Sequence, residues 1–310
     1  MQYEFWAQQD QDQWVYEAMT AKNKIEDWKK WKKCYNSPSI LIDRFTLLPD
    51  ISAITGMPAL SFMLRFSFRL HKPFLSKDER DFYLLENPLR REKVFQVPMF
   101  PSTGWKGSLR AALWQLGHKK DDEVTIRLFG NARDSDEGQA GRLYFYPTFF
   151  NRINPEAIDL EVLNPHSRKT GTGAHGPILL ECVPPGTPGD FVLLYMPFSL
   201  PGRNEADKCQ QVAEDLETAA GGIRAMLLTY GFGAKTSSGF GTVEEQLNEP
   251  GTLAIQAEWP NAGGKTPANL QSPMSKPDLP GYTAYSFGTL GELYSMAQGV
   301  ADRLRAGGAA

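Results

Sequence analysis

The segment from Gly231 to Gly241, GFGAKTSSGFG, has the composition of a loop that contacts phosphate. Glycine tolerates positive φ and lets another backbone approach closely, while free amide and hydroxyl groups donate hydrogen bonds to phosphate oxygens. The segment is not a Walker A loop, because there the lysine follows the last glycine and opens a helix. On composition alone, a glycine-rich turn without a ligand is an equally good interpretation. The candidate phosphate contacts are Gly233, Lys235, Thr236, Ser237 and Ser238.

A second candidate anion site lies at the start of a helix expected after Pro101. Ser102 or Thr103 can cap this helix, and Gly117 ends it. A helix N-terminus with free amides, hydroxyls and cations in its first turns is a favourable place for an anion. The alternative is a capped surface helix with solvated cations. The candidate residues are Ser102, Thr103, Lys106, Gly107, Ser108 and Arg110.

The cysteines and histidines form no pattern that indicates a catalytic or metal site. Cys34, Cys182 and Cys209 lie far apart without a CxxC pair, so neither a zinc knuckle nor a disulfide framework is predicted. The four histidines show no spacing typical of a Ser-His-Asp or Cys-His set. We therefore expect reduced, structural thiols and no Cys- or His-ligated metal.

The elements that must position the two candidate segments follow the order strand, helix, strands, helix, strand. Alternating apolar residues predict a half-buried first strand over 60–70, and helical spacing predicts helices over 104–116 and 204–229. Further strands are expected over 143–150, 160–163, 177–183 and 190–198, with a short last strand ending near Val243. This order predicts an α+β fold with a ferredoxin-like core and insertions.

Composition divides the chain into three expected regions. Residues 1–59 read as a helical extension in which Trp28 and neighbouring lysines either pack on the domain or contact nucleic acid. Residues 60–246 form the ferredoxin-like domain. Residues 247–310 read as a C-terminal tail, with a Gly/Pro-rich linker over 261–280 and an amphipathic helix from Leu290 to Leu304.

The charge balance limits how the protein meets nucleic acid. The 310 residues carry a formal net charge of -3, with a pI near 5.9. Non-specific affinity grows with the number of phosphates neutralised, so any nucleic-acid contact must be a local patch. No apolar run reaches membrane-spanning length, and we expect a cytoplasmic protein that does not contact a membrane.

Three segments taken together resemble the RAMP superfamily, the RNA-binding subunits of type III CRISPR-Cas effector complexes. They are FPSTGWKGSLR after a charged loop, RLFG and GRLYFYPTFF downstream, and GFGAKTSSGFG near the end. The resemblance covers roughly residues 60–243. It implies a modified RNA-recognition (RRM) fold in which the glycine loop and the helix start hold crRNA, while an extended hairpin interrupts guide–target pairing. The implied partners are crRNA, target RNA, and other RAMP and large subunits of the complex.

Within that superfamily, the segment over 163–187 is most similar to members that cap or join the crRNA filament, with the filament-forming members as a near alternative. In this interpretation the candidate RNA contacts include three residues of the loop after Asn164. They are His166, Arg168 and Lys169. His175 is a further candidate RNA contact, and an ordinary loop histidine is an equally good interpretation of both His166 and His175.

The resemblance also defines what a cleaving subunit would need. Cleaving members carry an aspartate before an Asn-Pro or Ser-Pro pair, which with a divalent cation promotes attack of a target 2′-OH on the next phosphate. Here Glu86 stands before Asn87, and a misplacement of about 1 Å can lower a rate about a hundredfold. Asp78 and Asp81 could substitute, although a solvated charge run is the commoner situation.

Three hypotheses follow. The first is a crRNA-binding structural subunit without strong intrinsic activity and without a cofactor. The second is a metal-dependent endoribonuclease acting on guide-paired target RNA, which would need Mg²⁺ or Mn²⁺. The third is a guide-processing RNase, for which His71 and His118 are the local histidines and no motif supports them.

Overall fold

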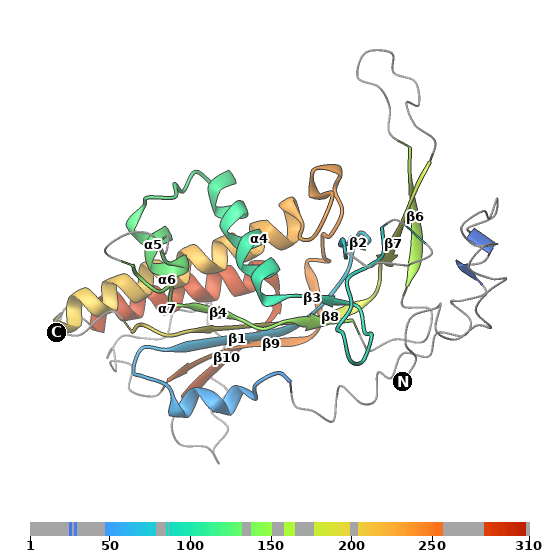
Figure 1. Cartoon of the computed structure of the whole chain (residues 1–310). Helices are drawn as coiled ribbons and strands as arrows, with labels where there is room; N and C mark the ends of the chain where they lie inside the picture. The colour runs from blue at the N-terminus through green and yellow to red at the C-terminus, as the bar shows by residue number, and fades with distance from the viewer. Residues whose placement is uncertain are drawn as a thin grey trace.

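A five-stranded antiparallel sheet in the order β10-β9-β1-β8-β4 is the framework of the computed structural model. The structure describes residues 25–26, 28–29, 47–78, 85, 87–131, 138–150, 158–164, 177–198, 204–256 and 282–307. The strands of this sheet are β1 (Phe62–Arg69), β4 (Leu143–Phe145), β8 (Pro188–Tyr195), β9 (Gln246–Gln256) and β10 (Tyr282–Thr289). Helices cover one face, and the 3₁₀ helix η2 (Ile51–Gly56) lies on the other (Figure 1).

Strand β1 is the predicted first strand, and it lies in the middle of the sheet between β8 and β9. Phe62 stands opposite Tyr195 on one side and Ile255 on the other. The predicted half-buried pattern is wrong, because η2 packs on the second face and buries Met63 against Ile54. The strand is therefore covered on both faces, which alternation in the sequence does not reveal.

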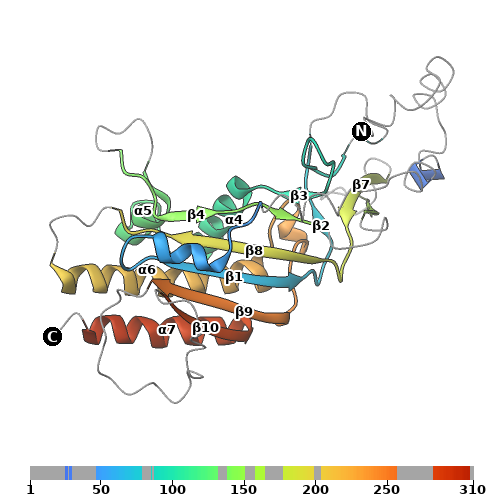
Figure 2. The same ribbon diagram turned by 90° about the horizontal axis from the view of Figure 1, so that it is seen from below.

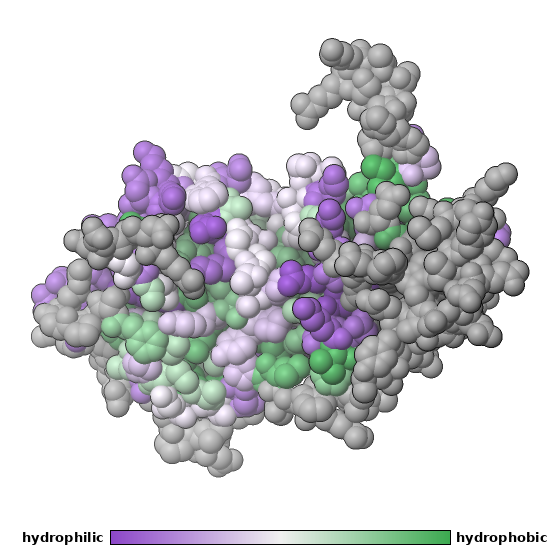
Figure 3. Space-filling view, viewed as in Figure 1, coloured by the Kyte–Doolittle hydropathy of each residue, from purple (hydrophilic) through white to green (hydrophobic). Residues whose placement is uncertain are grey.

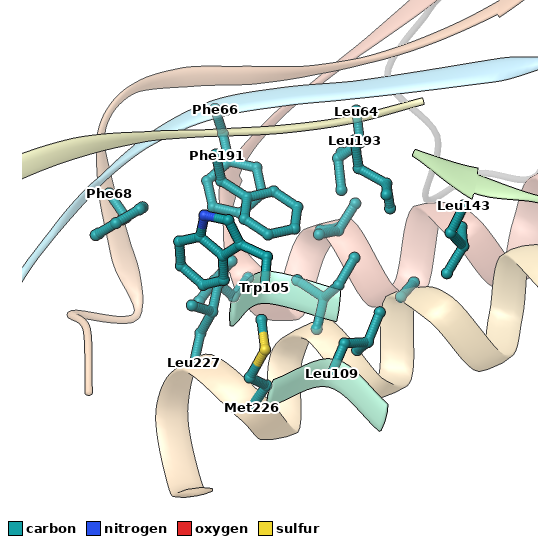
Figure 4. Close-up of a cluster of buried hydrophobic side chains, with 14 of the residues drawn as sticks. Leu64, Phe66, Phe68, Trp105, Leu109, Leu143, Phe191, Leu193, Met226 and Leu227 are labelled. Atoms are coloured by element: carbon teal, nitrogen blue, oxygen red, sulfur yellow. The ribbon is translucent and has the colours of Figure 1, made fainter. Parts of the chain in front are cut away.

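The helix predicted over 104–116 is α4 (Ser102–Gln115), which an aromatic anchor holds against the sheet. Trp105 is fully buried, and its ring centroid lies 5.0 Å from that of Phe191. Its indole N–H donates a 3.0 Å hydrogen bond to the Thr148 hydroxyl, so the buried polar group is satisfied. Figure 4 shows Trp105 directed toward the strands, with Met226 and Leu227 beside it.

The helix predicted over 204–229 is α6 (Glu205–Ala225), continued by the π-helix η3 (Met226–Tyr230). The terminal helix is α7 (Leu290–Gly307), and α6 and α7 lie side by side along the sheet (Figure 2). The short helix α5 (Glu123–Phe129) was not predicted. It is tied to α6 by a 2.9 Å ion pair between Arg127 and the buried Asp215. No helix among the described residues has the length and apolar character to cross a bilayer.

Short strands form two smaller sheets beside the main one. A three-stranded sheet has the order β2-β7-β6, and a two-stranded one pairs β3 with β5. The β6–β7 hairpin extends away from the body (Figure 1). The strand predicted over 143–150 is split between β4 and β5 around Pro147, which cannot donate to a ladder. The bounds are β2 (Phe74–Leu75), β3 (Met99–Phe100), β5 (Thr148–Phe149), β6 (Asp159–Leu163) and β7 (Ile178–Val183).

The chain after residue 243 differs from expectation. Val243 forms an isolated bridge with Leu70, and the last strand of the expected core, β9, begins at Gln246. The expected boundary between 246 and 247 therefore falls at the first residue of a central-sheet strand. Strand β10, which was not predicted, pairs with β9 along its length. Of the expected extension over 1–59, the described residues include η2 and Trp28, which is buried.

Candidate nucleic-acid interface

The two segments singled out in the sequence line one groove, which has a volume of about 860 Å³. Helix α4 contributes Thr103, Gly107 and Ser108 from its first turns, and lines the groove as far as Gln115. The glycine loop, residues 231–241, lies beside α4 in Figure 1. Its residues on the opposite side of the groove are Gly231, Gly233, Ala234, Thr236 and Ser237. The fold therefore brings together segments that are far apart in the sequence.

The start of α4 leaves backbone donors free. The predicted capping by Ser102 or Thr103 is wrong, because Pro101 is the N-cap residue and no side chain caps the helix. The N–H groups of Gly104 and Trp105 bond to the Pro101 carbonyl at 2.9 and 3.1 Å. The N–H groups of Ser102 and Thr103 bond to nothing in the described part of the chain. The positive end of the helix dipole is therefore uncapped beside the groove.

Close backbone packing explains the glycines of the loop. Gly231 and Gly241 have φ of 76° and 72°, and a Cβ atom on Gly241 would lie 1.9 Å from the Phe232 carbonyl oxygen. The Phe232 N–H donates to the Gly241 carbonyl at 3.0 Å, which closes the base of the loop. The Phe232 ring is buried 4.5 Å from that of Trp105. The loop is thus fixed to the helix that faces it.

The tip of the loop presents polar groups to solvent. Lys235 is exposed with a left-handed backbone (φ 60°), and the 3₁₀ turn η4 (Thr236–Ser238) follows it. Thr236 and Ser237 line the groove, whereas Lys235 and Ser238 lie outside its lining. The Lys235 ammonium pairs with no acidic residue in the described ranges. It is available to an anion that enters from solvent.

The structure places the predicted cations of α4 beside the groove instead of in its lining. Lys106 and Arg110 do not line it. Burial lowers the pKa of Lys106, and the positive charge of Arg110 lowers it further. Cations that sequence reasoning missed, Lys77 and Arg90, do line the groove. They lie in charged stretches that are typical of a solvated loop, so the sequence does not indicate that they line a groove.

A buried carboxylate fixes the segment that carries Arg90. Glu181 of β7 accepts hydrogen bonds of 2.9 Å from the Trp28 indole, the Leu89 N–H and the Arg91 guanidinium. The side chains of Glu181 and Arg91 are almost fully buried. Trp28 therefore packs on the domain, as one of the two interpretations of the N-terminal extension expects. The same carboxylate ties that extension to the hairpin base and to the groove wall.

Several predicted residues lie outside the part of the chain that the structure describes. They are Asp81, Glu86, His166, Arg168, Lys169 and His175. Asp78 is described, and its N–H donates to the Pro88 carbonyl at 3.1 Å. This bond joins the chain at Asp78 to the chain at Pro88, next to the groove residue Lys77. Within the described ranges, no three His, Cys, Asp or Glu side chains cluster as a metal site would require.

The surface around the groove is mainly hydrophilic. In Figure 3, hydrophilic and neutral residues follow the upper edge of the body over α4 and the glycine loop, and apolar surface appears at the β6–β7 hairpin. Val162 and Ile178 are exposed apolar side chains of that hairpin. The groove therefore offers hydroxyls, amides and cations, which together suit a phosphate backbone.

The two segments that line the groove fall within a region that matches a known protein family. Residues 73–244 match the family model described as the RAMP superfamily, which spans both sides of the groove. A protein of Streptococcus thermophilus named CRISPR system Cms endoribonuclease Csm3 is 26% identical over 173 residues, covering 51% of this chain and 74% of that protein. Its namesake in Mycobacterium tuberculosis is 28% identical over 179 residues, covering 52% and 74%.

A solved chain is also similar. It belongs to the cryo-EM structure of the Type III-B Cmr-beta bound to cognate target RNA, with 14% identity and a TM-score of 0.47. The match covers 72% of this chain and 73% of that chain.

Proposed function

This chain belongs to the RAMP superfamily, and we propose that it holds guide RNA as a subunit of a type III CRISPR effector complex. Its partners are then crRNA, the target RNA that pairs with it, and the other RAMP and large subunits of the assembly. The relatives named Csm3 support this assignment, since they match over half of this chain and most of their own length.

The observation that carries the proposal is the groove between α4 and the glycine loop. One side offers the uncapped amide of Thr103, with that of Ser102 next to it in the chain, and the other offers the hydroxyls of Thr236 and Ser237. Amides, hydroxyls and nearby lysines contact the sugar–phosphate backbone without reading sequence. A guide that changes from one complex to the next requires this sequence-independent contact.

We infer that the core is ferredoxin-like. The strand order β9-β1-β8-β4, with α4 following β1 and α6 following β8, supports a βαββαβ arrangement. In this interpretation β10 and α7 extend the core, because β10 adds a strand beyond β9 and α7 packs along α6. We accordingly propose that the domain continues beyond residue 246.

The test is guide retention at increasing salt. We expect Lys235→Ala, in a complex assembled with crRNA, to lower guide affinity and to reduce the slope of log affinity against log salt by about 0.7 for one lost phosphate contact. Lys120→Ala is the matched control, since Lys120 is also exposed but follows the C-terminal end of α4 and is not part of the glycine loop. Equal retention by parent and Lys235→Ala, with Thr236→Ala and Ser237→Ala also unchanged, would remove the proposed cradle.

The name of the Csm3 relatives, which calls them endoribonucleases, favours a second candidate, an endoribonuclease acting on guide-paired target RNA. The candidate carboxylates are Glu86, Asp81 and Asp78, with Mg²⁺ or Mn²⁺ supplied by solvent. A loaded complex incubated with target RNA and either cation tests it. Loss of one cut in the Glu86→Ala or Asp81→Ala complex, with target binding retained, would support cleavage. A parent complex that binds target and leaves it intact would exclude it.

A further inference from the structure

We propose that Trp114 is a stacking platform for a nucleobase of single-stranded RNA that runs along the flank of α4, with Arg110 and Lys106 contacting its phosphates. This inference rests on the proposed function, which it deepens by adding a base contact to a backbone cradle. Neither the sequence patterns nor the family match assigns a role to Trp114.

The three side chains form one stripe on the helix. Lys106, Arg110 and Trp114 follow one another at intervals of four residues, so they lie on one face, each about one turn above the last. The guanidinium carbon of Arg110 lies 5.4 Å from the centre of the Trp114 ring. Trp114 also comes seven residues, about two turns, after the groove residue Gly107. The stripe therefore borders the groove.

Two tryptophans of the same helix have opposite environments. Trp105 is 0% exposed with its indole N–H bonded to Thr148, whereas Trp114 is 44% exposed. In the described part of the chain, the Trp114 indole N–H has no hydrogen-bond partner. Trp114 is thus not a core residue, and nearly half of its surface is open to a ligand from solvent.

The two positive charges of the stripe favour a negatively charged ligand. Lys106 and Arg110 repel each other across one turn, and neither pairs with an acidic residue in the described ranges. A polyanion relieves this repulsion, and a chain that alternates phosphates with aromatic bases satisfies the cations and the ring together. Stacking on an aromatic side chain is independent of base identity, as binding of variable guides requires. RNA fits this stripe better than an acidic protein segment, which carries no regular aromatic groups.

The experiment separates base stacking from phosphate contact. The full-length chain is titrated with two fluorescein-labelled RNAs of equal length, one an oligouridine and the other abasic throughout. We expect Trp114→Ala to weaken oligouridine binding about 5- to 150-fold and to leave abasic RNA binding unchanged. Trp114→Phe should restore most of the affinity. Lys106→Ala should weaken the binding of both RNAs and lower the dependence of that binding on salt concentration.

Controls make each outcome decisive. Phe198→Ala removes an exposed aromatic side chain that contacts Tyr144 and, among the described residues, no cation. It should leave both affinities unchanged. If Trp114→Ala loses equal affinity for both RNAs, or loses affinity for neither, the stacking role is overturned. The proposed function still holds in that case if RNA binding depends on Lys235. Failure of the parent to bind any RNA overturns both. Release of a protein subunit from the Trp114→Ala complex, with RNA affinity unchanged, assigns the stripe to a protein contact instead.

Discussion

At the scale of single residues, two glycines of the glycine loop differ in whether a larger residue could replace them. Gly239 and Gly241 both have positive φ, of 84° and 72°, but a Cβ atom on Gly239 would meet nothing within 4 Å. On Gly241 it would lie 1.9 Å from the Phe232 carbonyl oxygen. Only the second position therefore combines backbone strain with a clash against backbone, which no rotamer change can relieve.

We expect Gly239→Ala to lower the free energy of unfolding by about 1–2 kcal/mol, the strain of a left-handed residue. Gly241→Ala should lower it by clearly more, because Phe232 must also move away from Trp105. Urea denaturation of the two variants measures the difference. Equal losses would mean that the loop base relaxes freely and does not position the groove wall.

A buried thiol offers a second check at this scale. Burial raises the pKa of Cys182 to about 12, with the carboxylates of Asp159 and Glu161 contributing. At pH 8 almost none of the thiol is the reactive thiolate, so iodoacetamide should leave Cys182 unmodified in the folded protein and modify it in urea. Peptide mapping by mass spectrometry reports the site. Rapid labelling under native conditions would contradict the buried position of β7.

Some residue roles could be predicted and others could not, for physical reasons. The need for glycine at Gly231 and Gly241 follows from local composition, because few other residues tolerate that backbone. The lining of the groove by Lys77 and Arg90 depends on how β2 and the segment after residue 87 fold back, which charge runs do not encode. The predicted cap at Ser102 is wrong because Pro101 takes the N-cap position and leaves the hydroxyl inside the first turn.

At the scale of elements, Glu181 joins parts that the sequence separates. It lies in β7 and bonds to the N-terminal extension through Trp28 and to the groove wall through Leu89 and Arg91. By contrast, Glu217 joins α6 to α7 through Arg305 at the surface, where the two side chains are 28% and 32% exposed. The two carboxylates bridge elements in similar ways and differ mainly in burial.

We expect Glu181→Gln to destabilise the protein by about 3–5 kcal/mol, because it removes the buried negative charge that bonds to the buried Arg91 guanidinium. Glu217→Gln is the matched control and should cost less than about 1 kcal/mol, since water screens an exposed pair. Thermal unfolding followed by circular dichroism compares them. Similar small losses would show that water reaches the Glu181 cluster and that it does not anchor the groove wall.

Prediction of elements succeeded where the signal is local. Long amphipathic segments gave α6 and α7, and apolar alternation gave β1. It failed for β9, which begins with the polar residues Gln246 and Asn248, because pairing with β1 and β10 stabilises that strand. The groove lies between such distant elements, and only the joint resemblance of both segments to one family placed them together in advance.

At the scale of the whole molecule, the acidic chain gathers cations around one groove. The net charge of -3 disfavours general attraction to nucleic acid, while Lys77, Arg90 and Lys235 gather at or near the groove. Strand β10 is the edge strand of the same sheet that positions this groove, and α7 packs along α6, although the residues of both were expected to form a tail outside the domain. The integrity of the groove should therefore depend on the C-terminal region.

Removal of residues 257–310 tests this dependence. Leu290, Leu293, Ala297 and Val300 of α7 are buried, and the truncation would expose the apolar surfaces of α6 and β9 that pack against α7 and β10. We expect the shortened chain to aggregate or to lose cooperative unfolding, whereas removal of 308–310 alone should leave both solubility and melting temperature unchanged. A soluble, cooperatively unfolding product ending at residue 256 that still retains guide RNA would instead establish the region after β9 as an independent tail, because the exposed α6 surface would then need no partner.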